Sequence, residues 1–180
     1  MAHSTAGAIA RLSSALLIGA AAVGSAPLAI AGDNDSDIYQ GAVESRLDSL
    51  AHLQPGLGTV MREYGDRFVD VYFAASGGNW GLAQYQLKEM REAQEVGEAT
   101  RPAKAPMLKM FEKSFLDPLD KTIRSKDLAG FKARYAETLK GCNGCHAATG
   151  HHFIHVHLPA QPVDAYLDFS VKSDPKGGDE

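Results

Sequence analysis

The residues with the most specific chemistry are Cys142, Cys145 and His146, which lie in the sequence Cys-Asn-Gly-Cys-His. The pattern Cys-x-x-Cys-His is the attachment sequence for c-type haem. Its two thiols add across the two haem vinyl groups, and the adjacent histidine presents an imidazole to the iron as proximal ligand. On a helix, Cys142 and His146 are four residues apart with Cys145 between them, so all three share one face. The sequence therefore predicts one covalently bound haem c.

Two other interpretations of this motif compete with haem attachment. A Cys-x-x-Cys pair also occurs as a redox-active disulfide and as half of a zinc site. The chain contains only two cysteines, so no second pair completes a zinc site. No strand-turn-helix signal of a thioredoxin fold precedes the motif. Haem would use both thiols and leave none for a structural disulfide.

The first 31 residues have the pattern of a secretory signal peptide. Arg11 is their only charged residue, an apolar run covers residues 15–23, and residues 29–31 form an Ala-Ile-Ala cleavage site. A retained membrane anchor is the alternative, but glycine, serine and proline soon interrupt the run, which is short for a membrane span. We expect export to the periplasm and no stable membrane span after cleavage. Export agrees with the haem motif, since bacteria attach haem covalently outside the cytoplasm.

The length and the net charge of the chain limit the classes of function that remain. Cleavage after residue 31 would leave 149 of the 180 residues, enough for one domain with a core. The chain has 18 Lys and Arg against 22 Asp and Glu, a formal net charge of −4. No basic patch indicates nucleic-acid binding. Mild acidity favours redox partner proteins with basic faces.

The periodicity of apolar residues predicts an all-α protein. Residues 32–54 read as an acidic lead-in and a short helix, whose apolar Val43, Leu47, Leu50 and Leu53 either pack on the domain, as we expect, or face a partner. Residues 55–150 contain four helical patterns joined by short loops, which predict an up-down-up-down four-helix bundle. Residues 151–180 form a histidine-rich extended tail, whose end, from Lys172 to Glu180, we expect to be disordered.

The boundaries of the four helices follow from capping and breaking residues. Ser76-Gly77-Gly78 ends the first helix, and Asn79 is a candidate N-cap for the second. Pro118 should kink or split the third helix. The stretch from Ser125 to Asp127 has cap chemistry before the fourth. Along that fourth helix the haem-binding residues continue the apolar stripe, so haem lies at its C-terminal end.

All four methionines after residue 1 fall at the haem end of such a bundle and precede the motif. They are Met61, Met90, Met107 and Met110. This order differs from small cytochromes in which the methionine ligand follows an N-terminal motif. A methionine on an apolar helical stripe is also a common core residue, because its side chain is flexible and polarizable.

A haem motif near the end of the last helix of a four-helix bundle resembles the class II c-type cytochromes, the cytochrome c′ group. The resemblance covers residues 55–150 as an architecture. It implies that His146 is proximal and that the first bundle helix supplies the distal position, as either an apolar residue or a methionine. Met61 matches that position, with Met107 and Met110 next and Met90 less favoured. Relatives in that group often dimerise through their first two helices, so the resemblance also implies a homodimer.

Two features depart from this group: the extension before the bundle and the 34 residues after His146. The tail carries four histidines, which suggest a second metal site, a distal haem ligand or a protonation-linked element. We favour a simpler arrangement, in which neighbouring apolar residues cover the haem edge and the histidines face solvent. His52 is a weaker ligand candidate. The four tail histidines are His151, His152, His155 and His157, and their apolar neighbours are Phe153, Ile154, Val156 and Leu158.

We expect a periplasmic electron carrier with one haem. The alternative is a five-coordinate haem protein that binds nitric oxide or carbon monoxide. We do not expect an enzyme such as a peroxidase, because the sequence shows no convincing distal acid-base pair, although a tail histidine would be one source. Coordination of iron by Met61 discriminates between these functions, since a thioether ligand closes the iron to gases.

Overall fold

The computed structural model describes residues 38–175. Within this range the chain is all-α and has no strand, apart from one isolated bridge between Asn79 and Ser173. The expected signal peptide (1–31), residues 32–37 of the acidic lead-in and residues 176–180 lie outside the described residues.

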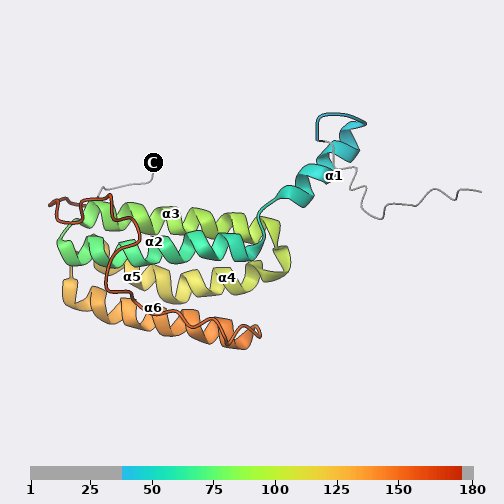
Figure 1. Cartoon of the computed structure of the whole chain (residues 1–180). Coiled ribbons are helices and arrows are strands. Elements are labelled where there is room, and N and C mark those ends of the chain that lie inside the picture. The colour runs from blue at the N-terminus through green and yellow to red at the C-terminus, as the bar shows by residue number, and fades with distance from the viewer. Residues whose placement is uncertain (1–37, 176–180) are drawn as a thin grey trace, which may run out of the picture. The chain divides into compact units, whose positions relative to one another are not determined.

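Helices α2 to α6 lie side by side in this region as successive rods of helix (Figure 1). The first two, α2 and α3, pack strongly along their length, while α5 contacts both α3 and α6, and α6 also contacts α2. The third rod is divided among α4, a π-helical turn and α5, and a 3-10 turn at Pro102–Lys104 precedes it. The bounds are α2 Leu57–Gly77, α3 Trp80–Thr100, α4 Ala105–Phe111, π-turn Glu112–Leu116, α5 Asp117–Arg124 and α6 Leu128–Ala148.

The helix ends form where the sequence places capping residues. Gly78 ends α2 with a φ of 82°, a left-handed conformation that glycine adopts without a Cβ clash. Asn79 accepts a hydrogen bond from the Leu82 amide at 3.2 Å, and Asp127 accepts one from the Gly130 amide at 3.0 Å. These bonds satisfy amides at the N-termini of α3 and α6 that have no partner within the helix.

Pro118 lies in the first turn of α5, directly after the π-helical turn. Proline has no amide hydrogen and is tolerated where a helix begins. The wider π-turn separates α4 from α5, so the expected division of the third helix at Pro118 is confirmed.

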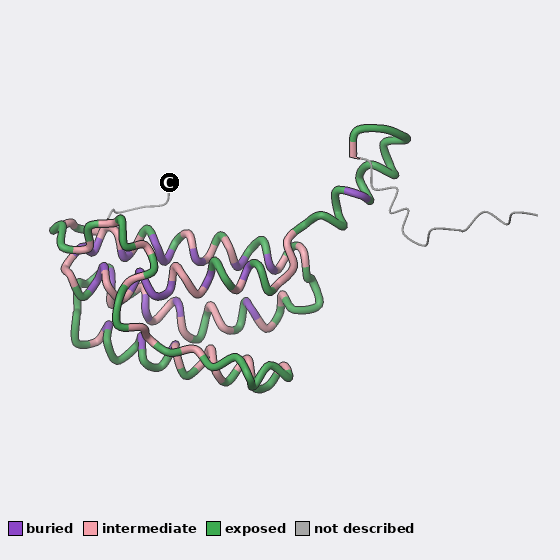
Figure 2. The backbone as a smooth tube through the Cα atoms, viewed as in Figure 1, coloured by how far each residue is buried: buried purple, intermediate pink, exposed green. Residues whose placement is uncertain are grey.

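The core consists of aromatic and aliphatic side chains between the rods. Phe68 of α2 stacks on Tyr135 of α6 with ring centroids 4.1 Å apart, and Phe131 meets the Trp80 ring edge to face. On α6, however, the fully buried residues are Phe131, Tyr135 and Thr138, all before Leu139. The C-terminal part of α6 has no fully buried residue, and Figure 2 shows it in pink and green.

Helix α1 (Val43–Leu53) is the short helix expected before the bundle. Its apolar side chains Val43, Leu47, Leu50 and Leu53 are all exposed. The expectation that this face packs on its own domain is therefore not confirmed in the described part of the chain.

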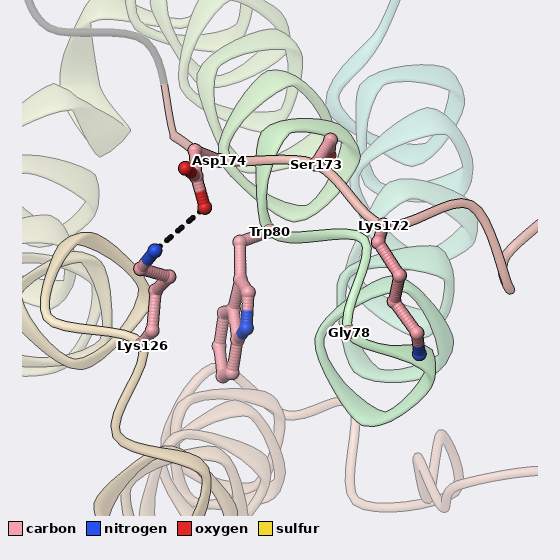
Figure 3. Close-up of a pocket in the computed structure, with 6 residues that line it drawn as sticks. All are labelled: Gly78, Trp80, Lys126, Lys172, Ser173 and Asp174. Atoms are coloured by element: carbon pink, nitrogen blue, oxygen red, sulfur yellow. Dashed lines mark hydrogen bonds and ion pairs between the residues drawn. The ribbon is translucent and has the colours of Figure 1, made fainter.

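Residues 151–175 of the tail return along α6 toward the beginning of α3 (Figure 1). Near its end, the Ser173 carbonyl accepts the Trp80 amide at 3.2 Å, and the Ser173 hydroxyl accepts the Gly81 amide at 2.9 Å. Asp174 forms an ion pair with Lys126 at 2.6 Å beside the Trp80 ring (Figure 3). Part of the stretch that we expected to be disordered is thus held against the bundle.

Asp70 of α2 forms hydrogen bonds with the middle of the tail, and its pKa is higher than usual for an aspartate. One of its carboxylate oxygens accepts the amides of Val163 at 3.1 Å and Asp164 at 3.4 Å. Burial raises the pKa of Asp70 to about 6, the two backbone donors oppose this, and the charge of Asp164 adds to it. Folding therefore favours the protonated form of Asp70 between its unfolded and folded pKa values.

Asp70→Asn should flatten the dependence of stability on pH. The stability that the raised pKa contributes is fully present below the unfolded value and is lost as pH rises through about 6. From about pH 4 to pH 7 the free energy of unfolding of the wild type should fall relative to the variant, by an amount on the order of 2 kcal/mol. Urea unfolding followed by circular dichroism measures this. If the free energy of unfolding of the two proteins changed with pH in parallel, the assignment of this pH dependence to Asp70 would be contradicted.

No helix among residues 38–175 is long and apolar enough to cross a membrane.

Candidate functional site

The five motif residues lie in the last two turns of α6, which runs through both cysteines and His146 without a break. Cys142 and Cys145 are each half-buried and are not joined in a disulfide. Burial raises the pKa of Cys142 to about 12 and also raises that of Cys145. A redox-active Cys-x-x-Cys pair has a lowered thiol pKa instead. The site thus offers two protonated thiols and one imidazole on consecutive turns of one helix.

Side chains from two other rods surround the thiols. The Cys145 thiol lies 3.6 Å from the sulfur of Met107. Met107 belongs to α4, which directly follows the 3-10 turn before the third rod. Tyr64 of α2 is buried and close enough to Cys142 and Cys145 for both thiols to affect its pKa, which burial raises well above its usual value. The Cys145 sulfur therefore lies against a thioether, and a buried phenol lies within electrostatic range of both thiols.

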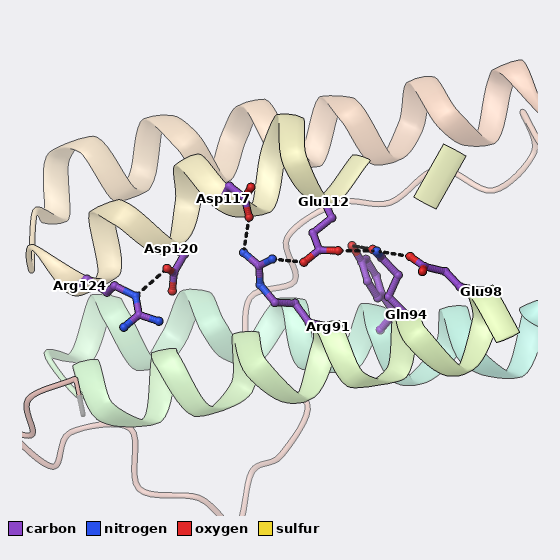
Figure 4. A network of polar contacts seen from close by, with 8 residues as sticks. Arg91, Gln94, Glu98, Glu112, Asp117, Asp120 and Arg124 are labelled. Carbon is purple, nitrogen blue, oxygen red and sulfur yellow. Dashed lines mark hydrogen bonds and ion pairs between the residues drawn. The ribbon is translucent and has the colours of Figure 1, made fainter. Parts of the chain in front are cut away.

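A network of polar side chains connects α3 to the third rod (Figure 4). The Tyr64 hydroxyl donates to the Gln94 side-chain oxygen at 3.3 Å, and the Gln94 amide donates to Glu112 at 3.1 Å. Arg91 pairs with both Glu112 and Asp117. Because Gln94 is fully buried and bonded on both sides, the network holds the Tyr64 hydroxyl in one position.

The tail supplies the partner of the histidine ring. The His146 Nδ1 atom lies 3.2 Å from the carbonyl oxygen of Ile154. A carbonyl oxygen can only accept, so Nδ1 carries the hydrogen and the neutral ring has its lone pair on Nε2. Two residues further along the tail, the side-chain amide of Asn143 bonds to both backbone groups of Val156. The imidazole is thus presented with Nε2 available as a ligand atom.

No family model, curated protein or solved structure matches this chain.

The structure separates the four methionines. Met107 contacts the motif, Met61 is half-buried and packs against the core one turn before Tyr64, Met90 is fully buried, and Met110 is 64% exposed. Sequence reasoning placed all four at the level of the motif, and the spacing along a rod does not show which side chain turns toward the cysteines. The choice of Met61 as distal ligand stays a prediction.

The tail histidines do not form a metal cluster. His151, His152, His155 and His157 are all exposed, as is His52 of α1. Within residues 38–175 no group of three or more His, Cys, Asp and Glu side chains is arranged to hold a metal ion. Of the neighbouring apolar residues, Leu158 packs against the core, whereas Phe153 is 74% exposed. The four histidines are exposed in the described residues, as the simpler arrangement predicts, and the cover of a haem edge by their apolar neighbours stays a prediction.

Sequence reasoning missed three contributors to this site: Asn143, the Ile154 backbone and Tyr64. Tyr64 lay on the predicted apolar stripe, but nothing distinguished it there from a core aromatic. Asn143 occupies a position in the motif that tolerates any residue. Ile154 contributes its backbone carbonyl, which every residue has, so the residue type at this position gives no signal.

Proposed function

We propose that this chain is an exported c-type cytochrome with one haem, attached through Cys142 and Cys145, that acts in electron transfer. The observation that carries the proposal is the pair of unpaired thiols and the His146 imidazole on one helix, with Nδ1 already bonded and Nε2 available. Iron ligation by a histidine whose other nitrogen donates to a backbone carbonyl is the common arrangement in metal sites.

Two further features support a bound group at this position. The motif end of α6 is only half-buried, although Cys142 and Leu139 continue the apolar stripe of the helix. The Tyr135 hydroxyl, two turns before Cys142, is buried and has no hydrogen-bond partner in the described structure. Such an orphaned hydroxyl costs stability unless another group satisfies it. The residues present therefore fit a haem covering this face.

The architecture supports the same proposal. The described helices α2 to α6 follow one another along the chain as an up-down-up-down four-helix bundle would require, and the motif lies at the end of the last of them. This resembles the class II c-type cytochromes over residues 55–150. The chain departs from that group in its tail, which packs on the bundle, so the tail is part of the proposed site.

Haem, when bound, supplies one-electron chemistry at iron. The chain would supply its position and its environment. His146 presents Nε2, the two cysteines hold the macrocycle, and the network behind Tyr64 keeps this side of the site rigid. Redox partners with basic faces, periplasmic location and a homodimer belong to the same proposal as predictions.

The test is expression with an N-terminal export signal in a bacterium that attaches haem to c-type cytochromes. The purified chain should retain haem through acid-acetone extraction and denaturing electrophoresis, and its mass should increase by one haem. Its reduced pyridine spectrum should show both vinyl groups saturated. A protein that reaches the periplasm folded and free of haem would refute the proposal.

Met61→Ala should distinguish electron transfer from gas binding. With Met61 as the sixth ligand, the wild type should be low-spin, show the weak far-red methionine-to-iron band and ignore carbon monoxide. The variant should lose that band and bind carbon monoxide. Met107→Ala, at the methionine that contacts Cys145, is the matched control and should keep the band. A high-spin wild type that binds carbon monoxide would instead favour the gas-binding alternative.

A further inference from the structure

The helix that carries the motif ends in a turn that sends the chain straight back along it. Gly150 has a φ of 80°, the Gly150 amide bonds to the Ala147 carbonyl, and the His151 amide bonds to the His146 carbonyl at 2.7 Å. Together these are the two bonds of a Schellman motif, in which glycine takes the left-handed position. The tail therefore runs antiparallel to α6 and passes the motif residues in reverse order.

Asn143 fixes the register of that return segment. Its side-chain Nδ2 donates to the Val156 carbonyl at 2.9 Å, and its Oδ1 accepts the Val156 amide at 2.7 Å. The side-chain amide thus pairs with both backbone groups of one residue, as a neighbouring strand would. No other tail residue between Gly150 and Leu158 has both of its backbone groups bonded to a bundle side chain in the described structure. Asn143 therefore decides which tail carbonyl lies opposite His146.

That carbonyl belongs to Ile154, whose oxygen lies 3.2 Å from Nδ1 of His146. Ile154 is two residues before Val156, so a tail held at Val156 is also held at Ile154. The Ile154 amide bonds in turn to the His151 carbonyl at 2.8 Å, which closes a turn between the Schellman motif and the Asn143 pair. The hydrogen-bond partner of the ring is thus fixed on both sides.

We infer that Asn143 is a positioning residue for the proximal histidine: through Val156 it holds the Ile154 carbonyl that selects the Nδ1–H form of His146. This rests on the proposed haem function and gives the tail a role in it. An imidazole that donates to a carbonyl is a stronger electron donor to a metal, which stabilises the oxidised iron. The tail should therefore lower the reduction potential.

The first experiment compares Asn143→Ala with Gly144→Ala in the holoprotein. Gly144 is the other variable position of the motif, and a Cβ there would meet nothing within 4 Å, so it controls for any change inside the motif. Redox titration should show an upward shift of the midpoint potential in Asn143→Ala and none in Gly144→Ala. The Fe–His stretching frequency of the reduced, ligand-photolysed protein should fall only in Asn143→Ala. Equal potentials in all three proteins, or equal shifts in both variants, would overturn the inference.

A second experiment needs no haem. In the full chain with both cysteines replaced by serine, long-range proton–nitrogen correlation spectra report which ring nitrogen of His146 carries the hydrogen. We expect the Nδ1–H form with Asn143 present, and a shift toward the Nε2–H form with faster exchange of the Val156 amide after Asn143→Ala. An unchanged tautomer would overturn the positioning role even if haem attaches. A wild type without haem would refute the proposed function, while this measurement would still report whether Asn143 controls the ring.

Discussion

Replacing both Cys142 and Cys145 by serine is expected to abolish covalent haem attachment completely. A hydroxyl does not add to a vinyl group under conditions in which a thiol does, and the chain has no other cysteine. Haem staining after denaturing electrophoresis and the mass of the intact chain both measure the loss. The single variants, Cys142→Ser and Cys145→Ser, should each lose one of the two thioethers.

The double variant should still fold, because serine is close in size to cysteine and neither position is fully buried. Its helix content by circular dichroism provides the control. Haem that remains attached after acid-acetone extraction of the folded double variant would contradict the assignment of these two thiols. Loss of helix content together with loss of haem would call for the same comparison in the single variants.

Phe68→Ala should give the largest loss of stability among single core substitutions at this level of the bundle. Phe68 is 2% exposed and stacks on Tyr135, with ring centroids 4.1 Å apart and planes at 8°. Removing the ring loses its transfer free energy and leaves a cavity between α2 and α6. A decrease of about 3–5 kcal/mol in the free energy of unfolding is expected, measured by urea denaturation.

Tyr85→Ala is the matched control for an aromatic ring on a helix, because Tyr85 lies on α3 and is 51% exposed. Its effect should stay within about 0.5 kcal/mol. Similar losses for the two variants would show that the Phe68 ring is not part of a packed core.

The sequence predicted most of the helical framework. Helical periodicity identifies α2, α3 and α6, and cap residues such as Asn79 and Asp127 give their beginnings, because these signals are local. Pro118 likewise marks the division of the third rod. The π-turn before it has no such signal, since a helix that widens by one residue keeps its composition.

The site was predicted in its residue types but not in its surroundings. Cys142, Cys145 and His146 follow from spacing alone. The path of the tail does not, because an extended segment held by backbone bonds to Asp70 and Asn143 has no periodicity that marks its partners. The contact of Met107 with Cys145 depends on rotation of one rod about its axis, which apolar spacing defines only coarsely.

The contacts of the tail also determine the order in which parts of the chain fold. The bond from Val163 to Asp70 joins residues 93 positions apart, and the bonds of Ser173 join it to the beginning of α3. Contacts at such separations form late, because they require the closure of a long loop. Packing of the helices closes that loop first and brings the two residues together. The tail should therefore dock last and open first, leaving the motif on an accessible helix end while the bundle is already assembled.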